Sequence, residues 1–201
     1  MKNLLIYQTS EYDCGTTCLL NALRFLFDRE ELNPDIVKAL MTYSLDSCDA
    51  NGEPGKQGTT SDSMRYIGCW VNRYSRTRQF PLHCTYLQGE DVQFHPESQL
   101  YHALEQGSVV VLHLYLGCPH YVLATGITEN SVLIFDPFYE ELDDPELDEE
   151  YFEEGITIHT DAPKKYNREI TLERLHHFTH NYYEMGEYDV RHALIFRRTT
   201  T

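Results

Sequence analysis

The chain has 201 residues, and 41% of them are hydrophobic. This is enough to bury one sizeable core, so we expect a single domain over residues 1–201. Its 32 acidic and 16 basic residues give a formal net charge of −16. A surface of this charge repels nucleic acid phosphates and anionic lipid head groups, which argues against nucleic-acid binding and against a membrane-surface role.

The N-terminal segment MKNLLIYQTSEYDC has too short an apolar run for a signal peptide, and the sequence has no run of about 18 apolar residues. We therefore expect a soluble, cytoplasmic protein without membrane insertion. Disulfides are rare in that compartment, and the cysteine spacing is scattered. Reduced thiols are expected at Cys14, Cys18, Cys48, Cys69, Cys84 and Cys118.

A first helix is predicted over residues 14–27. Its last ten residues include only two strongly polar ones, so this helix would be apolar on nearly all sides and buried. Asp13 is a natural N-cap, because its carboxylate can accept hydrogen bonds from the first free backbone N–H groups. Cys14 then lies in the first turn. A second helix is expected from about Pro34, since proline suits the first helical position.

The next segment predicts a loop and a short helix. Residues 44–60 are polar and rich in glycine, which indicates a loop. A helix is expected over 61–67, with Thr60 or Ser61 as its N-cap and Gly68 as its end. Irregular chain with extended segments should follow.

The second half of the chain predicts a sheet. A helix is expected over 96–107, opened by Pro96 and ended by Gly107. Strands rich in Val, Leu and Ile are expected at 108–116, 119–127 and 131–137. A helix is also expected over residues 170–180, and 190–198 resemble a final strand at the edge of the sheet. Helices followed by an antiparallel sheet define an α+β fold.

An acidic segment interrupts this pattern. Between residues 140 and 154 ten of fifteen residues are acidic and none is basic. Such a run suits a solvated loop or an exposed face. We interpret the region of about 139–170 as an acidic insertion, either a lid or a solvent-facing loop.

Cys14 has the position of a nucleophile. A thiol attacks as its thiolate, and the N-terminal turn of a helix stabilises negative charge through free N–H groups and the macrodipole. Gly15 would leave room for a substrate backbone and keep the N–H of Cys14 accessible to an oxyanion. Gln8 could donate the second hydrogen bond to that oxyanion. We predict Cys14 and Gln8 as catalytic residues, with Gly15 and Asp13 as substrate-binding residues.

Such a cysteine needs a base and an orienting acceptor. His120, at the start of a predicted strand behind a proline, is the preferred base, and His113 is the next candidate, although its central place in a strand favours a structural role. Asp136 lies sixteen residues beyond His120, where a hairpin would return the chain to the start of that strand. Its carboxylate could fix the tautomer of the imidazole.

Each residue also has a structural interpretation. A cysteine at a helix start is usually packed, a strand histidine is usually a core residue, and Asp-Pro is an ordinary turn. The pairs Cys14 with Cys18 and Cys118 with His120 fit no common zinc pattern well, so we expect no metal. The Gly-Lys in residues 51–60 lacks the order of a phosphate-binding loop, and no cofactor is expected.

Together these segments form an ordered set. Q-x5-C with D-C-G-x-x-C, then H-Y-V-x-x-T-G-I, then V-x-I-x-D-P resembles the papain-like peptidases that process bacteriocin leaders after a double glycine. The resemblance implies a papain-like fold with a buried N-terminal catalytic helix on an antiparallel sheet. It implies Cys14 as nucleophile, His120 as base and acid, Asp136 as its orienter and Gln8 as oxyanion donor. In that family Cys18 would face the core. Many relatives are fused to a transporter, whereas this sequence suggests a stand-alone domain.

The function expected is a cysteine peptidase that hydrolyses peptide bonds through a thioester and takes a peptide or protein as substrate. An acyltransferase with the same three residues is an alternative, because the two differ only in whether water or another acceptor takes the acyl group. A non-catalytic binding protein that holds a cationic partner on its acidic face is the third hypothesis. No feature of the sequence indicates an oligomeric state.

Overall fold

The computed structural model describes residues 3–44, 48–141, 149–160 and 165–199. Its helices are α1 (Cys14–Leu26), α2 (Pro34–Ser44), α3 (Ser61–Arg78), α4 (Gln99–Glu105) and α5 (Leu172–Leu175). Its strands are β1 (Leu82–Gln88), β2 (Val109–Tyr115), β3 (Pro119–Ile127), β4 (Ser131–Phe135), β5 (Ile156–Ile158), β6 (Arg168–Thr171) and β7 (His192–Arg198). Short 3-10 helices lie at Arg29–Glu31, Gly89–Asp91 and Glu149–Phe152.

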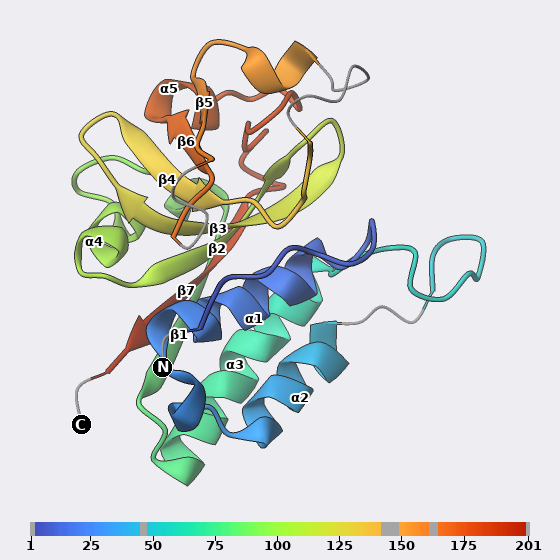
Figure 1. Ribbon diagram of the computed structural model, residues 1–201, viewed down its shortest axis with the longest axis vertical. Coiled ribbons are helices and arrows are strands. Elements are labelled where there is room, and N and C mark those ends of the chain that lie inside the picture. Colours follow the sequence, from blue (N-terminus) through green and yellow to red (C-terminus); the bar gives the residue numbers. More distant parts are fainter. Residues whose placement is uncertain (1–2, 45–47, 142–148, 161–164, 200–201) are drawn as a thin grey trace.

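The strands form one seven-stranded sheet in the order β1-β7-β2-β3-β4-β6-β5 (Figure 1). Every strand pairing is antiparallel. Helices α1, α2 and α3 lie together as a layer beside the sheet, and the N-terminal end of the chain runs along α1. The predicted α+β fold, with an N-terminal helix packed on an antiparallel sheet, is confirmed.

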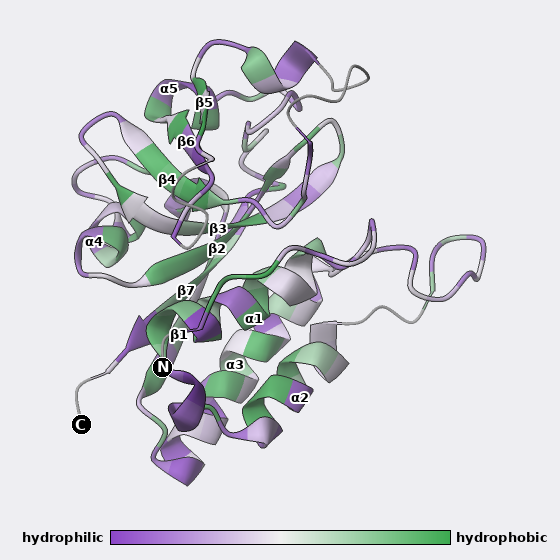
Figure 2. Ribbon diagram, viewed as in Figure 1, coloured by the Kyte–Doolittle hydropathy of each residue, from purple (hydrophilic) through white to green (hydrophobic). Residues whose placement is uncertain are grey.

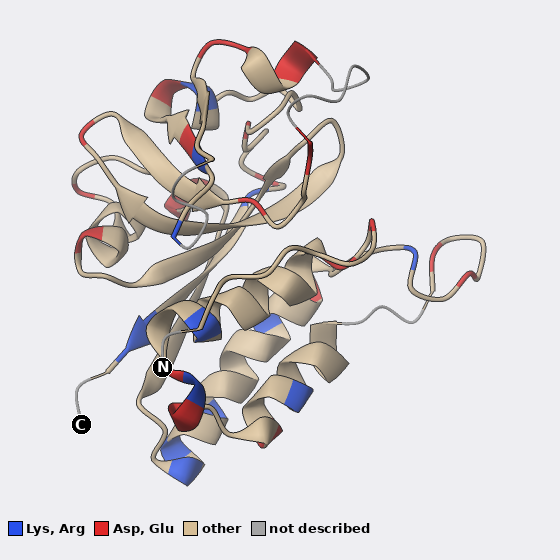
Figure 3. Ribbon diagram, viewed as in Figure 1, with Lys and Arg blue, Asp and Glu red and all other residues tan. Residues whose placement is uncertain are grey.

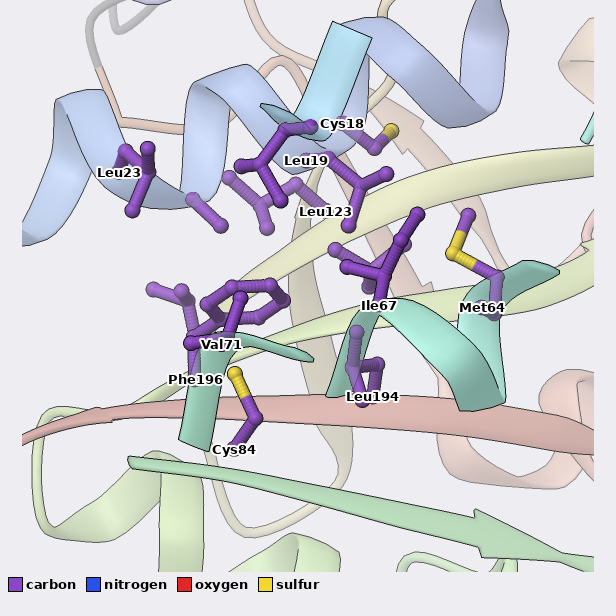
Figure 4. Close-up of a cluster of buried hydrophobic side chains, with 14 of the residues drawn as sticks. Cys18, Leu19, Leu23, Met64, Ile67, Val71, Cys84, Leu123, Leu194 and Phe196 are labelled. Carbon is purple, nitrogen blue, oxygen red and sulfur yellow. The ribbon is translucent and has the colours of Figure 1, made fainter. Parts of the chain in front are cut away.

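The buried residues form two cores, one on each face of the sheet. Side chains alternate along each strand, so neighbouring residues of β2 such as Val110 and Val111 contribute to different cores. The first core joins α1 and α3 to the sheet (Figure 4), through Cys18, Leu19, Leu23, Met64, Ile67, Val71, Cys84, Leu123, Leu194 and Phe196. The second contains residues of α4, α5 and the opposite strand faces. Figure 2 shows the apolar residues concentrated on the strands and on the helix faces that meet them.

Helix α1 is buried as predicted. Most of its side chains lie in the first core, because it packs on β2 and β3 while α2 and α3 lie alongside. Its one buried amide, Asn21, is satisfied by the backbone of Ile6, which donates to Oδ1 at 2.9 Å and accepts from Nδ2 at 2.8 Å. These bonds fasten the N-terminal segment that carries Gln8 along the helix.

Helix α3 is longer than predicted. It continues through Gly68 to Arg78, so the expected end at Gly68 was wrong. This glycine instead allows close packing on the sheet, since a Cβ there would lie 2.9 Å from Leu194 Cδ1. The N-cap prediction was right, because the Thr60 side chain accepts a hydrogen bond from Ser63 N–H.

The C-terminal strand lies inside the sheet, so its expected position at an edge was wrong. Strand β7 pairs with β1 on one side and with β2 on the other. Its first five residues are buried, as suits a strand covered on both faces. The helix expected over 170–180 is only the single turn α5, because β6 occupies the residues before it.

The acidic segment is partly built into the fold. Residues 142–148 and 161–164 of the predicted insertion lie outside the described residues. Glu149 and Glu150 are exposed, but Tyr151 beside them is buried in the second core. Strands β5 and β6 extend the sheet beyond β4, and Figure 3 shows acidic residues around them. Among the described residues, no helix has the length and apolar character needed to cross a membrane.

Candidate active site

Cys14 is the first residue of α1 and its side chain is buried. The Asp13 carbonyl accepts the N–H of Thr17 at 2.8 Å, as at an ordinary helix start. The Asp13 carboxylate makes no hydrogen bond to the helix. The N–H groups of the first turn therefore remain available to a negative charge near Cys14. The positive end of the helix dipole also stabilises such a charge.

The prediction that the Asp13 carboxylate caps α1 was wrong. It turns back and accepts hydrogen bonds from the N–H and hydroxyl groups of Thr9 and Ser10, at 2.9 to 3.2 Å. Burial raises the pKa of Asp13, but these four donors outweigh it and lower the pKa below its ordinary value. The carboxylate thus fixes the loop between Gln8 and the helix, because that loop supplies nearer donors than the helix does. It is engaged within the chain, and the substrate-binding role of Asp13 stays a prediction.

Gln8 is joined to the segment that follows Asp136. Its N–H donates to the Pro137 carbonyl at 2.8 Å, and its side-chain Nε2 donates to the Ser10 carbonyl at 3.0 Å. Its Oε1 is buried and has no hydrogen-bond partner in the described part of the chain. An amide nitrogen carries two hydrogens, so Nε2 keeps one more donor. The oxyanion role of Gln8 depends on that donor and stays a prediction.

His120 and Asp136 form a buried pair. Strand β3 begins just before His120, β4 ends just before Asp136, and their pairing brings the two residues together. His120 Nε2 lies 2.8 Å from Asp136 Oδ1, and the residues are 5% and 1% exposed. The hairpin spacing in the sequence predicted this contact.

The imidazole of His120 is held in its charged form. Burial lowers its pKa, but the charge and hydrogen bond of Asp136, with a smaller effect of a hydrogen bond to Cys14, raise the pKa to about 10. Burial raises the pKa of Asp136, and its interaction with His120 reverses this and lowers the pKa below the ordinary value. Because Nε2 is bound to Asp136, Nδ1 is the nitrogen left for the thiol. The structure therefore brings a cysteine, a histidine and an aspartate into one chain of contacts.

Asp136 is fixed by residues that the sequence did not single out. Asn167 accepts the N–H of Asp136 at 2.7 Å and donates to its carbonyl at 2.8 Å. The Tyr183 hydroxyl donates to Asp136 Oδ2 at 2.8 Å and accepts from Arg168 Nε at 3.0 Å. The N–H of Phe138 donates to Oδ1 at 2.9 Å. Together these bonds hold one carboxylate oxygen toward the imidazole.

Tyr183 adopts an uncommon backbone conformation. Its φ of 59° lies in the left-handed region, which bulky residues rarely occupy. The residue is completely buried, and its N–H donates to the Tyr115 carbonyl at 2.7 Å. Such strain persists where the surrounding structure imposes it and is frequent near functional sites. Here the strained residue is Tyr183, whose hydroxyl donates to Asp136.

The expected reason for Gly15 was wrong. A Cβ at this residue would lie 2.5 Å from Thr59 Oγ1, 2.7 Å from Thr59 Cβ and 3.2 Å from Met64 Cε. The space is therefore filled by Thr59, whose hydroxyl donates to the Ser44 carbonyl at 2.9 Å, and not left for a substrate backbone. Gly15 allows α1 to pack against the loop that leads into α3.

Gly15→Ala is expected to lower the free energy of unfolding by about 1 to 3 kcal/mol, because the new methyl group would overlap Thr59 close to its backbone. Gly68→Ala is the matched control, since its Cβ would meet only the rotatable end of Leu194 and should cost less. Urea unfolding of both variants measures the difference. Equal losses would contradict the tight fit at Gly15.

His113 is packed in the interior of β2. Its ring stacks on His192 with centroids 4.5 Å apart and meets Tyr121 edge-on at 5.4 Å. Burial, with a smaller effect of neighbouring histidines, lowers the pKa of His113 to about 3. An imidazole with this pKa is neutral near pH 7 and is a weak base. This environment fits the structural role that the sequence favoured.

Acidification is expected to destabilise the protein through His113. Between pH 6.5 and about 3 the unfolded chain binds a proton there and the native chain does not. The stabilising contribution is present above pH 6.5 and is lost as the pH falls, by up to about 1.4 kcal/mol per unit. When the pH falls from 7 to 5, the free energy of unfolding of the parent should therefore decrease. In His113→Gln this decrease, measured by urea unfolding, should be smaller by roughly 1 to 2 kcal/mol. The exposed His83→Gln is the control, and equal pH dependence in all three proteins would contradict the prediction.

Cys18 packs in the core one turn beyond Cys14. It is completely buried, its Sγ donates to the Tyr121 carbonyl at 3.3 Å, and burial raises its pKa well above the ordinary value. Cys14, Cys18, Cys69, Cys84 and Cys118 are free thiols. Within the described ranges, no group of three or more His, Cys, Asp or Glu side chains is arranged to hold a metal ion.

No protein-family model and no curated protein matches the chain. Chains of solved structures do resemble it, among them the following three. A Bacillus anthracis protein described as a C39-like peptidase has a TM-score of 0.53 and 13% identity, with all of both chains covered. The peptidase domain of Streptococcus ComA, a bifunctional ABC transporter of a quorum-sensing pathway, has a TM-score of 0.47 and 13% identity, also over all of both chains. A double glycine motif protease from an AMS/PCAT transporter, in complex with the leader peptide, has a TM-score of 0.42 and 14% identity over 99% of this chain and 96% of its own.

The likeness to the Bacillus anthracis protein concerns the fold, since few residues are identical. The chain has the papain-like fold of the C39-like peptidases, as the sequence motifs predicted. Helix α1, which starts with Cys14, and the β3-β4 hairpin, which carries His120 and Asp136, are the elements that meet at the candidate site.

Proposed function

We propose that the chain is a cysteine peptidase that acts on a peptide or protein substrate within one domain. Cys14 is the nucleophile, His120 the base and acid, Asp136 the residue that orients His120, and Gln8 an oxyanion donor. One observation carries this proposal: the buried imidazole of His120 lies between the Asp136 carboxylate and the Cys14 thiol at the N-terminus of a helix.

The first half of the reaction follows from this geometry. His120 holds the proton of the Cys14 thiol, and the thiolate attacks the peptide carbonyl carbon to form a carbon–sulfur bond. The carbonyl π electrons move to oxygen, and the backbone N–H of Cys14 with the amide of Gln8 stabilises that oxyanion. When the carbon–nitrogen bond breaks, His120 gives its proton to the leaving amine, and a thioester remains.

The second half reverses these roles. His120 takes a proton from water, the resulting hydroxide attacks the thioester carbonyl, and the carbon–sulfur bond breaks. The acid product leaves, and Cys14 and His120 share a proton again. Asp136 keeps Nε2 engaged throughout, so that Nδ1 faces the sulfur in both halves.

Iodoacetamide labelling at pH 5 to 9, followed by mass spectrometry, tests the pair without a substrate. Cys14 should label faster than the other buried cysteines already near pH 6, and His120→Ala should slow that labelling at least tenfold. Exposed Cys69 and Cys118 are internal controls whose labelling should not depend on His120. If Cys14 labels no faster than Cys18 and is insensitive to His120→Ala, the peptidase proposal fails and a binding function is favoured.

Acyl transfer would share the first half of this reaction. Adding amine or thiol acceptors during turnover separates the two activities, because a transferase would divert the acyl group from water to the acceptor. Release of free acid as the main product at millimolar acceptor supports hydrolysis.

A further inference from the structure

A cavity of about 650 Å³ opens beside Cys14. One wall is the loop of residues 57–61 that leads into α3, and the others come from strands β1, β2 and β3 and from residues 188–192. His120 does not line this cavity. The leaving amine would lie against His120, which protonates it, so we assign this cavity to the acyl side of the scissile bond.

Several of the residues that line this cavity are aromatic. Four tyrosines and two histidines line it: Tyr86, Tyr115, Tyr121, Tyr188, His113 and His192. The Tyr121 hydroxyl lies 2.6 Å from His192 Nε2, and His192 Nδ1 lies 3.0 Å from the Val190 carbonyl. A carbonyl can only accept, so Nδ1 carries the hydrogen and Nε2 accepts from Tyr121. Burial lowers the pKa of His192, as it does that of His113, so both rings are neutral.

Arg191 also lines the cavity, but its guanidinium already binds groups of the chain itself. Its Nε donates to the Gly186 carbonyl at 2.7 Å and its Nη2 donates to the His176 carbonyl at 3.0 Å. Its charge also lies over the rings of Phe178 and Tyr188, at 4.9 and 4.7 Å from their centroids. Arg65 on α3 also acts electrostatically on Tyr86, one of the lining residues.

An exposed carboxylate also lies at the cavity. Asp189 lines the cavity, is exposed, and pairs with no cation in the described part of the chain. Aromatic faces attract cations, and phenol oxygens accept hydrogen bonds. A cavity of this volume lies in the range of pockets that hold sizeable ligands, so it exceeds what a glycine needs.

We propose that this cavity, which rests on the proposed peptidase function, binds a lysine or arginine side chain of the substrate immediately before the scissile bond. Its aromatic walls cover the aliphatic stem and attract the cationic head, and Asp189 pairs with that head at the rim. The neutral pair His113 and His192 forms a floor that does not repel it. The chain would therefore cleave after basic residues and not after glycine.

Peptidyl acyloxymethyl ketones that differ only in the residue next to the ketone test this pocket. The Cys14 thiolate displaces the carboxylate leaving group and forms a thioether, whose rate of formation mass spectrometry measures. Lysine and arginine probes are expected to label Cys14 at least tenfold faster than the glycine probe, and faster than the tyrosine probe. A glycine probe that is equally fast, or a tyrosine probe that is fastest, overturns the proposal.

Asp189→Asn is expected to reduce the rate of the lysine probe about three- to tenfold and to leave iodoacetamide labelling unchanged. Asp35→Asn, an exposed carboxylate on α2, is the matched control and should change neither. An Asp189→Asn variant with the parent's preference for lysine over tyrosine contradicts the pairing at the rim. If iodoacetamide labels Cys14 rapidly but no ketone does, the peptidase function itself fails, and the pocket with it.

Discussion

Cys14→Ala is expected to abolish peptide hydrolysis, with a loss in kcat on the order of 10⁴-fold or more, because no other group in the site can form the acyl-enzyme. Cys18→Ala is the matched control. It removes a thiol from the same helix one turn further on, where the sulfur donates to a backbone carbonyl and packs in the core. This control should keep most of the activity and lose roughly 1 to 2 kcal/mol of stability.

Turnover of a fluorogenic peptide with a basic residue before the cleaved bond measures both variants. Circular dichroism shows whether each is folded. Activity in Cys14→Ala close to that of the parent would contradict the nucleophile assignment. An equal loss in Cys14→Ala and Cys18→Ala would show that the helix, and not one thiol, is what the reaction needs.

Asp136→Ala is expected to lower the free energy of unfolding by about 3 to 5 kcal/mol, because it leaves the charged His120 buried without its partner. Activity should fall by about 10² to 10⁴, since the imidazole loses its orientation. Asp136→Asn keeps the shape and removes the charge, so it should be less destabilised. It should also show a lower pKa for His120, visible by NMR.

The cost of Asp136→Ala depends on pH. The raised pKa of His120 contributes stability that is fully present below about pH 6.5 and is lost as the pH rises through about 10. The lowered pKa of Asp136 contributes stability that is present above about pH 4 and is lost on acidification. The difference between parent and variant in urea unfolding should therefore be largest near pH 5 to 6. A cost that is the same at pH 6 and pH 10 would contradict a charged pair.

The central pair of the site could be predicted because its geometry is local in sequence. A hairpin of two apolar strands fixes which residues meet at its open end, and that rule alone is enough to pair His120 with Asp136. The nucleophile is similarly marked by a helix start. The apolar run that identifies α1 is reliable because the whole helix is buried.

The support around Asp136 could not be predicted. Asn167 and Tyr183 lie 31 and 47 residues beyond it, and neither belongs to a periodic pattern or a recognisable motif. The same reason explains why the position of β7 in the sheet was wrongly predicted. Its apolar sequence predicts a strand but does not say which strands pair with it. Strand pairing across long separations depends on the whole sheet, which a local pattern does not contain.

The structural predictions for Asp13, Gly15 and Gly68 were wrong because each of these residue types has more than one common structural role. Asp13 occupies the N-cap position, but the donors of Thr9 and Ser10 bind its carboxylate in place of the helix. The sequence suggests an open approach at Gly15 and a helix end at Gly68. Gly15 instead marks a place where Thr59 comes too close for a Cβ, and Gly68 marks a place where the end of the Leu194 side chain packs on the helix. A glycine alone does not say which of these uses applies.

The position of β7 has a consequence for how the protein is made. Cys14, His120 and Asp136 all leave the ribosome before residues 192–198, yet these later residues join the edge strand β1 to β2 and the rest of the sheet. A nascent chain that lacks them has two unpaired strand edges and an incomplete wall beside the thiol. The candidate site is thus completed only once synthesis has passed β7.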